Sequence, residues 1–219
     1  MASLPITERP MRADARRNRE RVLDAALHCF ASDGLEAQMD DIASRAKVGV
    51  GTVYRHFPTK DALIEAIADD YFARQTEAAG AALEVEDPWK AFSGYVRRAS
   101  DILGEYRALT QVLSDRPEVM GAAAFRAAEK LGFFDILTTL IDRAKEAGGL
   151  REDFRIEDIP LIMCSLGSLQ TRKGEYTSWR RMREIVLDGL RAPGFGALPD
   201  EPAPAFRGKR LSGTPRRAG

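Results

Sequence analysis

The side chains with the clearest chemical use gather in one short segment of the N-terminal third of the chain. Thr52 can hydrogen-bond a base edge or touch a thymine methyl, and Tyr54 and His56 can donate to phosphate oxygens. Lys60 adds a positive charge at the start of the following helix. Gly51 has no side chain, so a partner can approach the backbone closely there. Together these residue types predict contacts with the phosphates and base edges of DNA.

Two short helices must position these side chains. One is predicted over residues 39–46, with acidic residues in its first turn, where the helix dipole favours negative charge. The other follows the three-residue turn Lys47-Val48-Gly49 and ends before Pro58. This order is typical of a helix-turn-helix, here over residues 38–57. Apolar residues on the inner side would fix the crossing angle of the two helices: Ile42, Ala43, Val48, Val53 and Phe57.

The predicted DNA-contacting residues lie on or near the outer surface of this segment. Four of them, Tyr54, Arg55, His56 and Lys60, have no packing role that the sequence suggests. A helix-turn-helix outline also occurs in proteins that never contact DNA, so these outward polar residues carry the prediction. The complete predicted set is Gln38, Ser44, Lys47, Gly49, Val50, Gly51, Thr52, Tyr54, Arg55, His56 and Lys60.

Overall charge adds little to this prediction. The chain has 33 basic and 33 acidic residues, so its net charge is zero and no global basicity favours nucleic acid. Four arginines, Arg16, Arg17, Arg19 and Arg21, cluster where the first apolar helix begins. They can meet phosphates, although a solvated helix face is the commoner meaning of such a run.

The hydrophobic pattern predicts an all-α fold of about nine helices. Apolar residues recur at spacings of three and four from residue 14 to residue 191, and nowhere alternate with polar ones as in strands. Hydrophobic residues make up 44% of the 219, enough for a packed interior. Thr59 and Asp87 are predicted N-caps, the second followed by Pro88 at the first helical position. The expected helices cover about residues 14–32, 39–46, 50–57, 60 onward, 88–104, 106–114, 117–147, 156–171 and 175–191.

The chain ends and the cysteines indicate a cytoplasmic protein. Residues 1–13 are predicted to be a flexible arm, and residues 192–219, rich in Pro, Gly and Arg, a disordered tail. No apolar run is long enough to span a bilayer, and the N-terminus lacks a signal-peptide stretch. Cys29 and Cys164 each lie inside an apolar helical pattern and outside any CxxC pair. We therefore expect a reduced protein without disulfides and without membrane contact.

An enzyme is the main alternative from another functional class. The two histidines are His28, with no carboxylate or cysteine partner implied by spacing, and His56 in the predicted DNA-binding segment. Motifs such as HExxH, GxSxG and a glycine-rich phosphate loop do not occur. The sequence thus predicts no catalytic residue, no metal site and no cofactor.

The N-terminal segment resembles a known family. Five stretches, Leu23–Phe30, Gly34, Ile42-Ala43, Gly51–Lys60 and Ala62-Leu63, are similar to the DNA-binding domain of the TetR family of bacterial regulators. The similarity covers about residues 14–76, and Asp188-Gly189-Leu190 near the last helix also resembles members of the family. The resemblance implies a DNA-binding domain over 14–76 and a regulatory and dimerisation domain over 77–191. It also implies a homodimer that represses transcription from a palindromic operator of double-stranded DNA and releases it when a small effector binds.

Four positions depart from the usual pattern of the family. Gln38 stands where a threonine commonly caps the second helix and contacts a phosphate. Lys47 replaces the usual turn glycine, which adds a possible phosphate contact. Gly49 and Val50 replace a serine and a polar or basic residue at the start of the recognition helix. The last change predicts fewer hydrogen bonds to bases and more apolar or shape readout.

The resemblance implies a ligand chamber and a dimer interface in the C-terminal region. For the chamber, the candidates are the apolar residues Phe92, Val96, Phe125, Phe133 and Met163, which favour a hydrophobic or aromatic effector. Each of them, taken singly, is more often an ordinary core residue. For the interface, the candidates on the last two helices are Leu161, Ser165, Leu166, Leu169, Ile185 and Val186.

Other interpretations of this region remain open at the level of sequence. The last two helices can instead pack only against their own chain. The protein can also be a DNA-binding regulator without a small-molecule effector, controlled by a partner or by its abundance. Activation in place of repression is a further alternative, because it depends on where the operator lies relative to a promoter.

Overall fold

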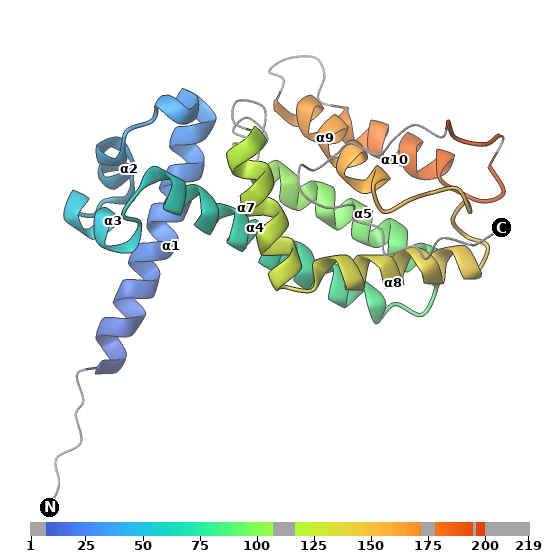
Figure 1. Cartoon of the computed structure of the whole chain (residues 1–219), viewed down its shortest axis with the longest axis horizontal. Coiled ribbons are helices and arrows are strands. Elements are labelled where there is room, and N and C mark those ends of the chain that lie inside the picture. The colour runs from blue at the N-terminus through green and yellow to red at the C-terminus, as the bar shows by residue number, and fades with distance from the viewer. Residues whose placement is uncertain (1–7, 107–116, 172–177, 195, 200–219) are drawn as a thin grey trace, which may run out of the picture.

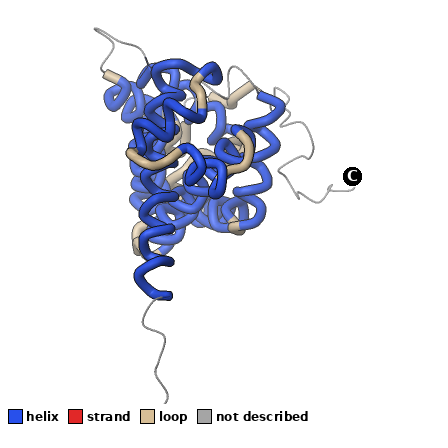
Figure 2. The backbone as a smooth tube through the Cα atoms, turned by 90° about the vertical axis from the view of Figure 1, so that its left-hand side faces the viewer, coloured by secondary structure: helices blue, strands red, loops and turns tan. Residues whose placement is uncertain are grey.

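The computed structural model describes residues 8–106, 117–171, 178–194 and 196–199. Within these residues the chain forms nine α-helices and one 3-10 helix, joined by loops, as expected for an all-α protein (Figure 1, Figure 2). In the same residues the β-type pairing is a single antiparallel bridge between Leu150 and Arg191. The elements are α1 (Glu8–Asp33), η1 (Gly34–Glu36), α2 (Met39–Ala46), α3 (Val50–His56), α4 (Lys60–Leu83), α5 (Pro88–Glu105), α7 (Pro117–Lys130), α8 (Phe133–Glu146), α9 (Asp158–Thr171) and α10 (Trp179–Gly189).

Helix α4 joins two groups of helices. At its N-terminal end it packs on α1, beside η1, α2 and α3 (Figure 1). Helix α7 packs along its first half, where Glu65 pairs with Arg126 and Asp69 with Lys130, and its C-terminal part packs on α5 and α8. It begins at the predicted cap, where Thr59 Oγ1 accepts a hydrogen bond from Ala62 N at 3.1 Å. The helix continues to Leu83, so the predicted domain boundary at residue 76 falls inside a continuous helix.

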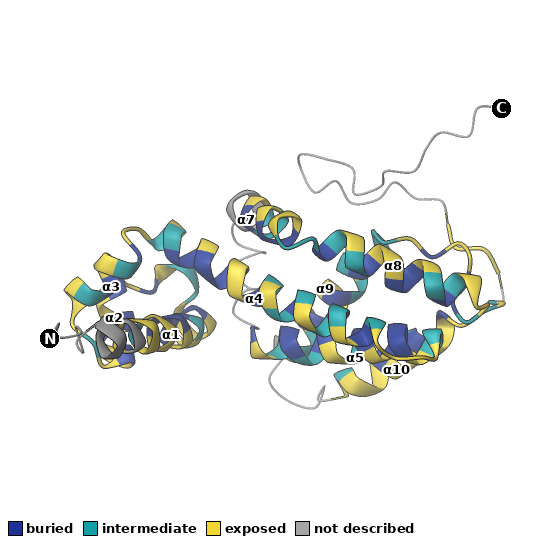
Figure 3. Cartoon of the chain, turned by 90° about the horizontal axis from the view of Figure 1, so that it is seen from below, coloured by how far each residue is buried: buried dark blue, intermediate teal, exposed yellow. Residues whose placement is uncertain are grey.

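The larger group surrounds α4 with α5, α7 and α8, and adds α9 and α10 on the far side of α5. In Figure 3 the buried sides of α4, α5 and α8 face one another, and exposed residues lie on the outer sides. Helix α5 starts at the predicted cap, where Asp87 Oδ1 accepts from Lys90 N at 2.9 Å and Pro88 occupies the first turn. Helix α10 is held to α5 by the buried Arg183, which donates to Ser100 Oγ and Asp101 Oδ1, each at 3.3 Å.

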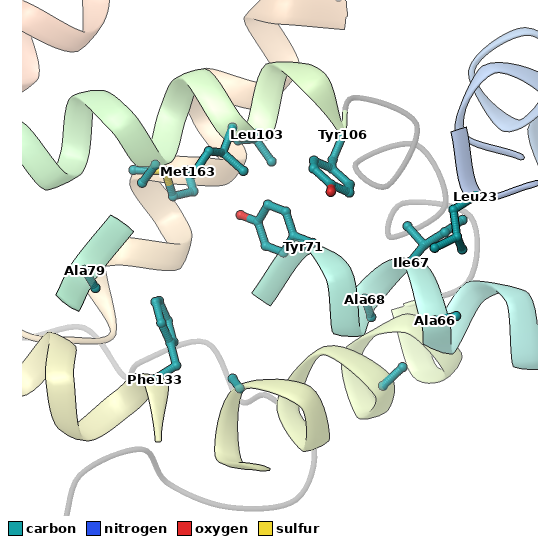
Figure 4. Packing of buried hydrophobic residues seen from close by; sticks show 14 of the residues in the cluster. Leu23, Ala66, Ile67, Ala68, Tyr71, Ala79, Leu103, Tyr106, Phe133 and Met163 are labelled. Atoms are coloured by element: carbon teal, nitrogen blue, oxygen red, sulfur yellow. The ribbon is translucent and has the colours of Figure 1, made fainter. Parts of the chain in front are cut away.

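A chain of aromatic contacts runs through the interior of this group. Tyr106 at the end of α5 contacts Tyr71 of α4 with ring centroids 5.4 Å apart, and the neighbouring Phe72 contacts Phe133 of α8, also at 5.4 Å (Figure 4). Phe133 is followed by Phe134, whose ring lies 5.5 Å from Phe125 of α7. Burial raises the pKa of Tyr106 to about 12, so its phenol is protonated and donates to the Asp70 carboxylate. Four helices thus share one aromatic core.

Two helix boundaries differ from the predicted ones. Helix α1 begins at Glu8, within the segment predicted to be a flexible arm. The long helix predicted over residues 117–147 is divided into α7 and α8, because Gly132 between them adopts φ 65°, a left-handed conformation that ends a helix. The short helix predicted over 106–114 lies almost wholly outside the described residues, and so does the predicted start of the last helix at 175.

The first residues after α10 are ordered, which corrects the prediction of disorder from residue 192. Ala192 N donates to Gly149 O at 3.2 Å, and Leu198 N donates to Asp153 Oδ2 at 2.8 Å. The Arg151 guanidinium, which is largely buried, pairs with Asp153 and also donates to Gly196 O. This pairing and the Leu198 amide hold the pKa of Asp153 well below its usual range. Residues 200–219 lie outside the described part of the chain.

Among the described residues, no helix is long and apolar enough to cross a membrane.

Candidate nucleic-acid interface

The turn between α2 and α3 is closed by backbone hydrogen bonds. Lys47 N donates to Ser44 O and Val48 N to Ala43 O, each at 3.1 Å. Lys47 adopts φ 55° and ψ 45°, the left-handed conformation in which a helix commonly ends and which glycine adopts most easily. Gly49 then takes an extended conformation as the N-cap of α3. The turn therefore directs α3 across α2, as predicted for a helix-turn-helix.

Apolar side chains buried on the inner side of the motif hold the two helices together. Ile42 and Val53 are fully buried, and Ala43 and Phe57 are 3% and 2% exposed. Val48 is half-buried and packs against the same core from the turn. The prediction that these five residues anchor the motif is confirmed. Burial of side chains of this size stabilises the motif by about 1.5–3 kcal/mol for each large one.

The outer side of α3 faces solvent. Val50 is 42% exposed and Tyr54 48% exposed, so both side chains are available to a partner. Gly51 and Arg55 are exposed, and Thr52 and His56 are half-buried. The structure thus brings the predicted residues of α3 onto one accessible surface, which we call the α3 face: Val50, Gly51, Thr52, Tyr54, Arg55 and His56.

The predicted contact residues of α2 and the turn are also accessible. Ser44, Lys47 and Gly49 are exposed. Gln38 occupies the N-cap position of α2 in an extended conformation, but its side chain makes no capping hydrogen bond. Its amide Nε2 instead donates to Glu36 O at 2.6 Å, which leaves the side chain at the surface beside the first turn of α2.

Lys60 has a role within the fold that the sequence did not suggest. Its Nζ is 2.7 Å from Leu35 O, the backbone of η1 just before α2. The prediction that Lys60 lacks a structural partner was therefore wrong: the side chain ties the start of α4 to the segment that leads into α2. An ammonium group has three N–H donors, so a phosphate contact through another of them stays a prediction.

Helix α1 supports the end of α3 through Arg19. Its guanidinium lies 5.2 Å from the ring centroid of Phe57, a cation–π contact that covers the last apolar anchor of the motif. The other three arginines of the predicted cluster interact within α1: Arg16 pairs with Glu20, Arg17 with Asp14, and Arg21 with Asn18. The sequence did not distinguish Arg19 from its neighbours, because Phe57 lies 38 positions further along the chain.

Comparison with known proteins agrees with this geometry. Residues 22–67 match the family described as "Bacterial regulatory proteins, tetR family", and residues 87–192 match "Transcriptional regulator SbtR-like, C-terminal domain". A solved structure of a TetR transcription regulatory protein from Mycobacterium vanbaalenii is 37% identical in sequence. The similarity covers 84% of this chain and 100% of that chain, with a TM-score of 0.60. The chain belongs to the TetR family.

Two further relatives are also described as transcriptional regulators. A TetR transcriptional regulator from Streptomyces coelicolor is 32% identical over 80% of this chain and 99% of that chain, with a TM-score of 0.58. The HTH-type transcriptional repressor KstR of Mycolicibacterium smegmatis is 28% identical over 151 residues, 68% of this chain and 73% of the relative. The protein is therefore a DNA-binding transcriptional regulator with a helix-turn-helix, and it belongs to a family without enzymatic activity.

The predicted effector residues of this TetR-family protein are spread over its C-terminal group of helices. Phe92 and Val96 are fully buried in α5, and Phe92 contacts Phe154 with ring centroids 5.5 Å apart. Phe133 and Met163 are 6% and 8% exposed. Phe125 is half-buried in α7 against Phe134. All five residues have packing partners or are buried, and their contact with an effector stays a prediction.

The predicted interface residues divide into accessible and buried ones. Leu161 and Ile185 are 49% and 56% exposed, and Ser165 is exposed. Leu169 and Val186 are half-buried. Leu166 is 1% exposed, which corrects its assignment to the interface: it lies in the core of its own chain and has no surface to offer a partner. Helix periodicity alone could not show which side of α9 its own chain covers.

Replacing Lys47 separates the conformation of the turn from its charge. Lys47→Gly relieves the left-handed conformation of a residue with a Cβ, so we expect the free energy of unfolding to rise by about 0.5–1 kcal/mol. Lys47→Ala removes the charge but keeps the Cβ, and should give no such gain. Urea unfolding measures the difference, and equal stability of the two variants would contradict the strain argument.

Replacing Gly51 tests how closely DNA approaches the α3 face. A Cβ at this position meets nothing within 4 Å in the protein, so Gly51→Ala should stabilise α3 by about 0.5–1 kcal/mol. If the DNA backbone or a base edge contacts Gly51, affinity for a duplex selected by the protein should fall on the order of tenfold, about 1.4 kcal/mol.

Gly80→Ala is the matched control for this substitution. Gly80 lies in α4 far from the α3 face, and its Cβ would likewise meet nothing within 4 Å. This variant should gain stability with unchanged DNA affinity. Unchanged affinity of Gly51→Ala as well would mean that DNA does not approach this part of α3 closely.

Proposed function

We propose that the protein is a homodimeric repressor that binds a palindromic operator through the α3 face and releases it when a small molecule binds among the C-terminal helices. The accessible α3 face on a firmly packed helix-turn-helix carries this proposal. Such a regulator works on chromosomal DNA, in the cytoplasm. The relatives named as KstR repressors favour repression over activation.

The composition of the α3 face supports recognition of the operator sequence through both polar and apolar contacts to the bases. Thr52 can hydrogen-bond a base edge, and Val50 can pack on a thymine methyl. Tyr54 can donate to a phosphate, and Arg55 and Lys47 add positive charge beside it. Few of these side chains can make two hydrogen bonds to one base. We therefore infer that apolar contact and DNA shape contribute a large part of the specificity.

An exposed apolar surface on the last two helices supports dimerisation. Leu161 of α9 and Met182 and Ile185 of α10 are 49%, 44% and 56% exposed. On α9, next to Leu161 on the same side of the helix, the small residues Cys164 and Ser165 are exposed and allow close approach of another helix. Pairing two copies through this surface, which we call the α9–α10 face, removes apolar area from water. A two-fold axis there would set the two recognition helices about one DNA turn apart, on the order of 34 Å.

Two polar contacts hold one side of α10 against its own chain. Arg97 of α5 binds Glu184 through both carboxylate oxygens, with Nη2 2.8 Å from Oε2 and Nε 3.1 Å from Oε1. Arg183, one residue earlier, reaches Ser100 and Asp101. The pairing with Arg97 lowers the pKa of the Glu184 carboxyl. Because these contacts hold one side of α10 to its own chain, Ile185 and Met182 remain on the outer side.

Selection of bound sequences from random DNA duplexes, at a stated salt concentration, tests the proposed function. A dimer should enrich a palindrome whose half-sites lie about one helical turn apart. Enrichment of a single half-site would contradict the two-fold arrangement. Salt-sensitive binding without any enrichment would contradict sequence-specific regulation by the protein alone.

Charges on the α9–α10 face should separate the subunits. We expect the double variant Leu161→Glu/Ile185→Glu to sediment as a monomer and to bind the selected palindrome on the order of 100-fold more weakly, because the two half-sites are then bound independently. Thr138→Glu, which places a charge on the exposed side of α8, is the control and should stay dimeric. A double variant that remains a dimer in sedimentation would show that the interface lies elsewhere.

A further inference from the structure

Gln75 is a buried polar residue that neither the DNA-binding segment nor the α9–α10 face uses. It lies in α4 within the C-terminal group of helices and is 2% exposed. Its Nε2 donates to Ala99 O of α5 at 3.2 Å. Its Oε1 is buried and has no hydrogen-bond partner among the residues that the structure describes. A buried polar atom without a partner costs stability, so its presence calls for an explanation.

The orientation of the Gln75 amide follows from its neighbour. The carbonyl of Ala99 can only accept, so the amide nitrogen must face it. Exchanging the two ends of the amide would place one oxygen against another. The acceptor Oε1 is therefore the end that faces the interior without a partner.

Tyr71, beside Gln75, is one of two neutral phenols that lie close together. Tyr71 lies one turn earlier on the same side of α4, and its phenol is a hydrogen-bond partner of the Gln75 side chain. This contact lowers the pKa of the phenol, as an N–H that donates to the phenol oxygen does, so it belongs to Nε2 and not to Oε1. The hydroxyl of Tyr71 points toward the side where Met163 and Leu103 lie (Figure 4). Tyr95 of α5 is 2% exposed and close to Tyr71. Burial raises the pKa of both phenols well above the ordinary value, so both stay protonated and uncharged.

Apolar side chains lie beyond the hydroxyl of Tyr71. Leu103 of α5 and Met163 of α9, 6% and 8% exposed, lie on the side toward which it points, and Phe133 of α8, 6% exposed, lies below Met163 in Figure 4. Neither these side chains nor the two phenols carry a charge. Burial of an unpaired charge among them would be costly, whereas a neutral molecule with one hydrogen-bond donor would fill the single missing contact.

Gln170 of α9, on the other side of α5, is a second glutamine whose side-chain oxygen is buried. Its Nε2 donates to Ser100 O at 2.9 Å, and its Oε1 is likewise buried with no hydrogen-bond partner in the described part of the chain. Its oxygen, however, lies against Gly104, where an added Cβ would be only 3.0 Å away. The Gln170 side chain is thus packed tightly against α5 at Gly104.

We propose that Gln75 is the polar recognition group of the effector site, and that the effector is an uncharged, largely apolar molecule with an O–H or N–H group that donates to Gln75 Oε1. This inference rests on the proposed function, in which a small molecule binds among the C-terminal helices. The apolar body of the effector lies beside Met163, Leu103 and Phe133, and the hydroxyl of Tyr71 lies at the polar end with Gln75. Helix α4 carries Gln75 and begins beside the helix-turn-helix, so a molecule bound there contacts the element shared with the DNA-binding half.

Matched aromatic probes test the inference directly. Isothermal titration of the full-length protein, without DNA, compares 2-naphthol with 2-methoxynaphthalene and naphthalene, which lack the donor. We expect 2-naphthol to bind about tenfold more tightly than either, the usual effect of one hydrogen bond to a buried acceptor. In Gln75→Leu this preference should disappear while the affinity for naphthalene is kept. In Gln170→Leu, the matched control, the preference should remain.

Three outcomes would overturn the inference: equal affinity of the wild type for the three probes, no binding of any of them, or a preference for 2-naphthol that survives in Gln75→Leu. The first two would mean that Gln75 Oε1 meets at most a buried water. Thermal unfolding checks that the variants are folded, and Gln75→Met, which keeps the length of the side chain, takes the place of Gln75→Leu if that variant is unfolded.

Operator affinity, measured on the same samples without probes, separates this inference from the proposed function. A protein that binds its operator but shows no preference for 2-naphthol refutes the role of Gln75 and leaves DNA binding intact. A protein that prefers 2-naphthol through Gln75 but binds no specific operator supports the site and refutes the proposed function.

Discussion

Helix α4 is shared by the cores of both halves of the molecule, and the rest of the structure depends on this. Leu63 and Ile64 near its start are buried in the DNA-binding half, which contains α1, whereas Tyr71 and Ala79 are buried in the half with α5, α7 and α8. A continuous helix keeps its ladder of backbone hydrogen bonds and does not bend cheaply. Displacement of one end of α4 is therefore carried to the other end, beside the helix-turn-helix. The same helix thus connects the DNA-binding half to the half in which we propose effector binding.

Apolar burial, rather than surface charge, holds α4 in place. Two ion pairs join it to α7, Glu65 with Arg126 at 2.6 Å and Asp69 with Lys130 at 3.7 Å, but the side chains are more than half exposed. Exposed pairs of this kind contribute about 0–1 kcal/mol each and weaken with salt. The aromatic contacts that run from Tyr106 to Phe125 are buried or half-buried and do not weaken in this way. The polar contacts of Arg183 hold α10 against α5 and so fix which side of α10 faces outward.

The structure keeps its DNA-binding surface and its interior chemically distinct. The α3 face is rich in donors and is accessible, so water satisfies its polar groups until DNA replaces the water. Around Gln75 the reverse holds, because a buried acceptor has no protein partner among the described residues. The same side-chain type at Gln170 is closely packed, so burial of a glutamine does not by itself indicate a binding site. The unoccupied acceptor beside two neutral phenols is what distinguishes Gln75.

The sequence by itself determined the all-α fold and most of its helices, the caps at Thr59 and Asp87, the inner and outer sides of the helix-turn-helix, and the family. These features depend on residues three or four positions apart, whose interactions are local and periodic. Tertiary structure alone decided the partners that are distant in sequence: Lys60 with the Leu35 carbonyl, Arg19 with Phe57, and the loop around Arg151 with the segment after α10. It also decided that Leu166 is covered by its own chain and that Gln75 Oε1 lacks a partner. Amphipathic pattern fixes which residues prefer burial, but only the packing of helices far apart in the chain fixes what covers each of them.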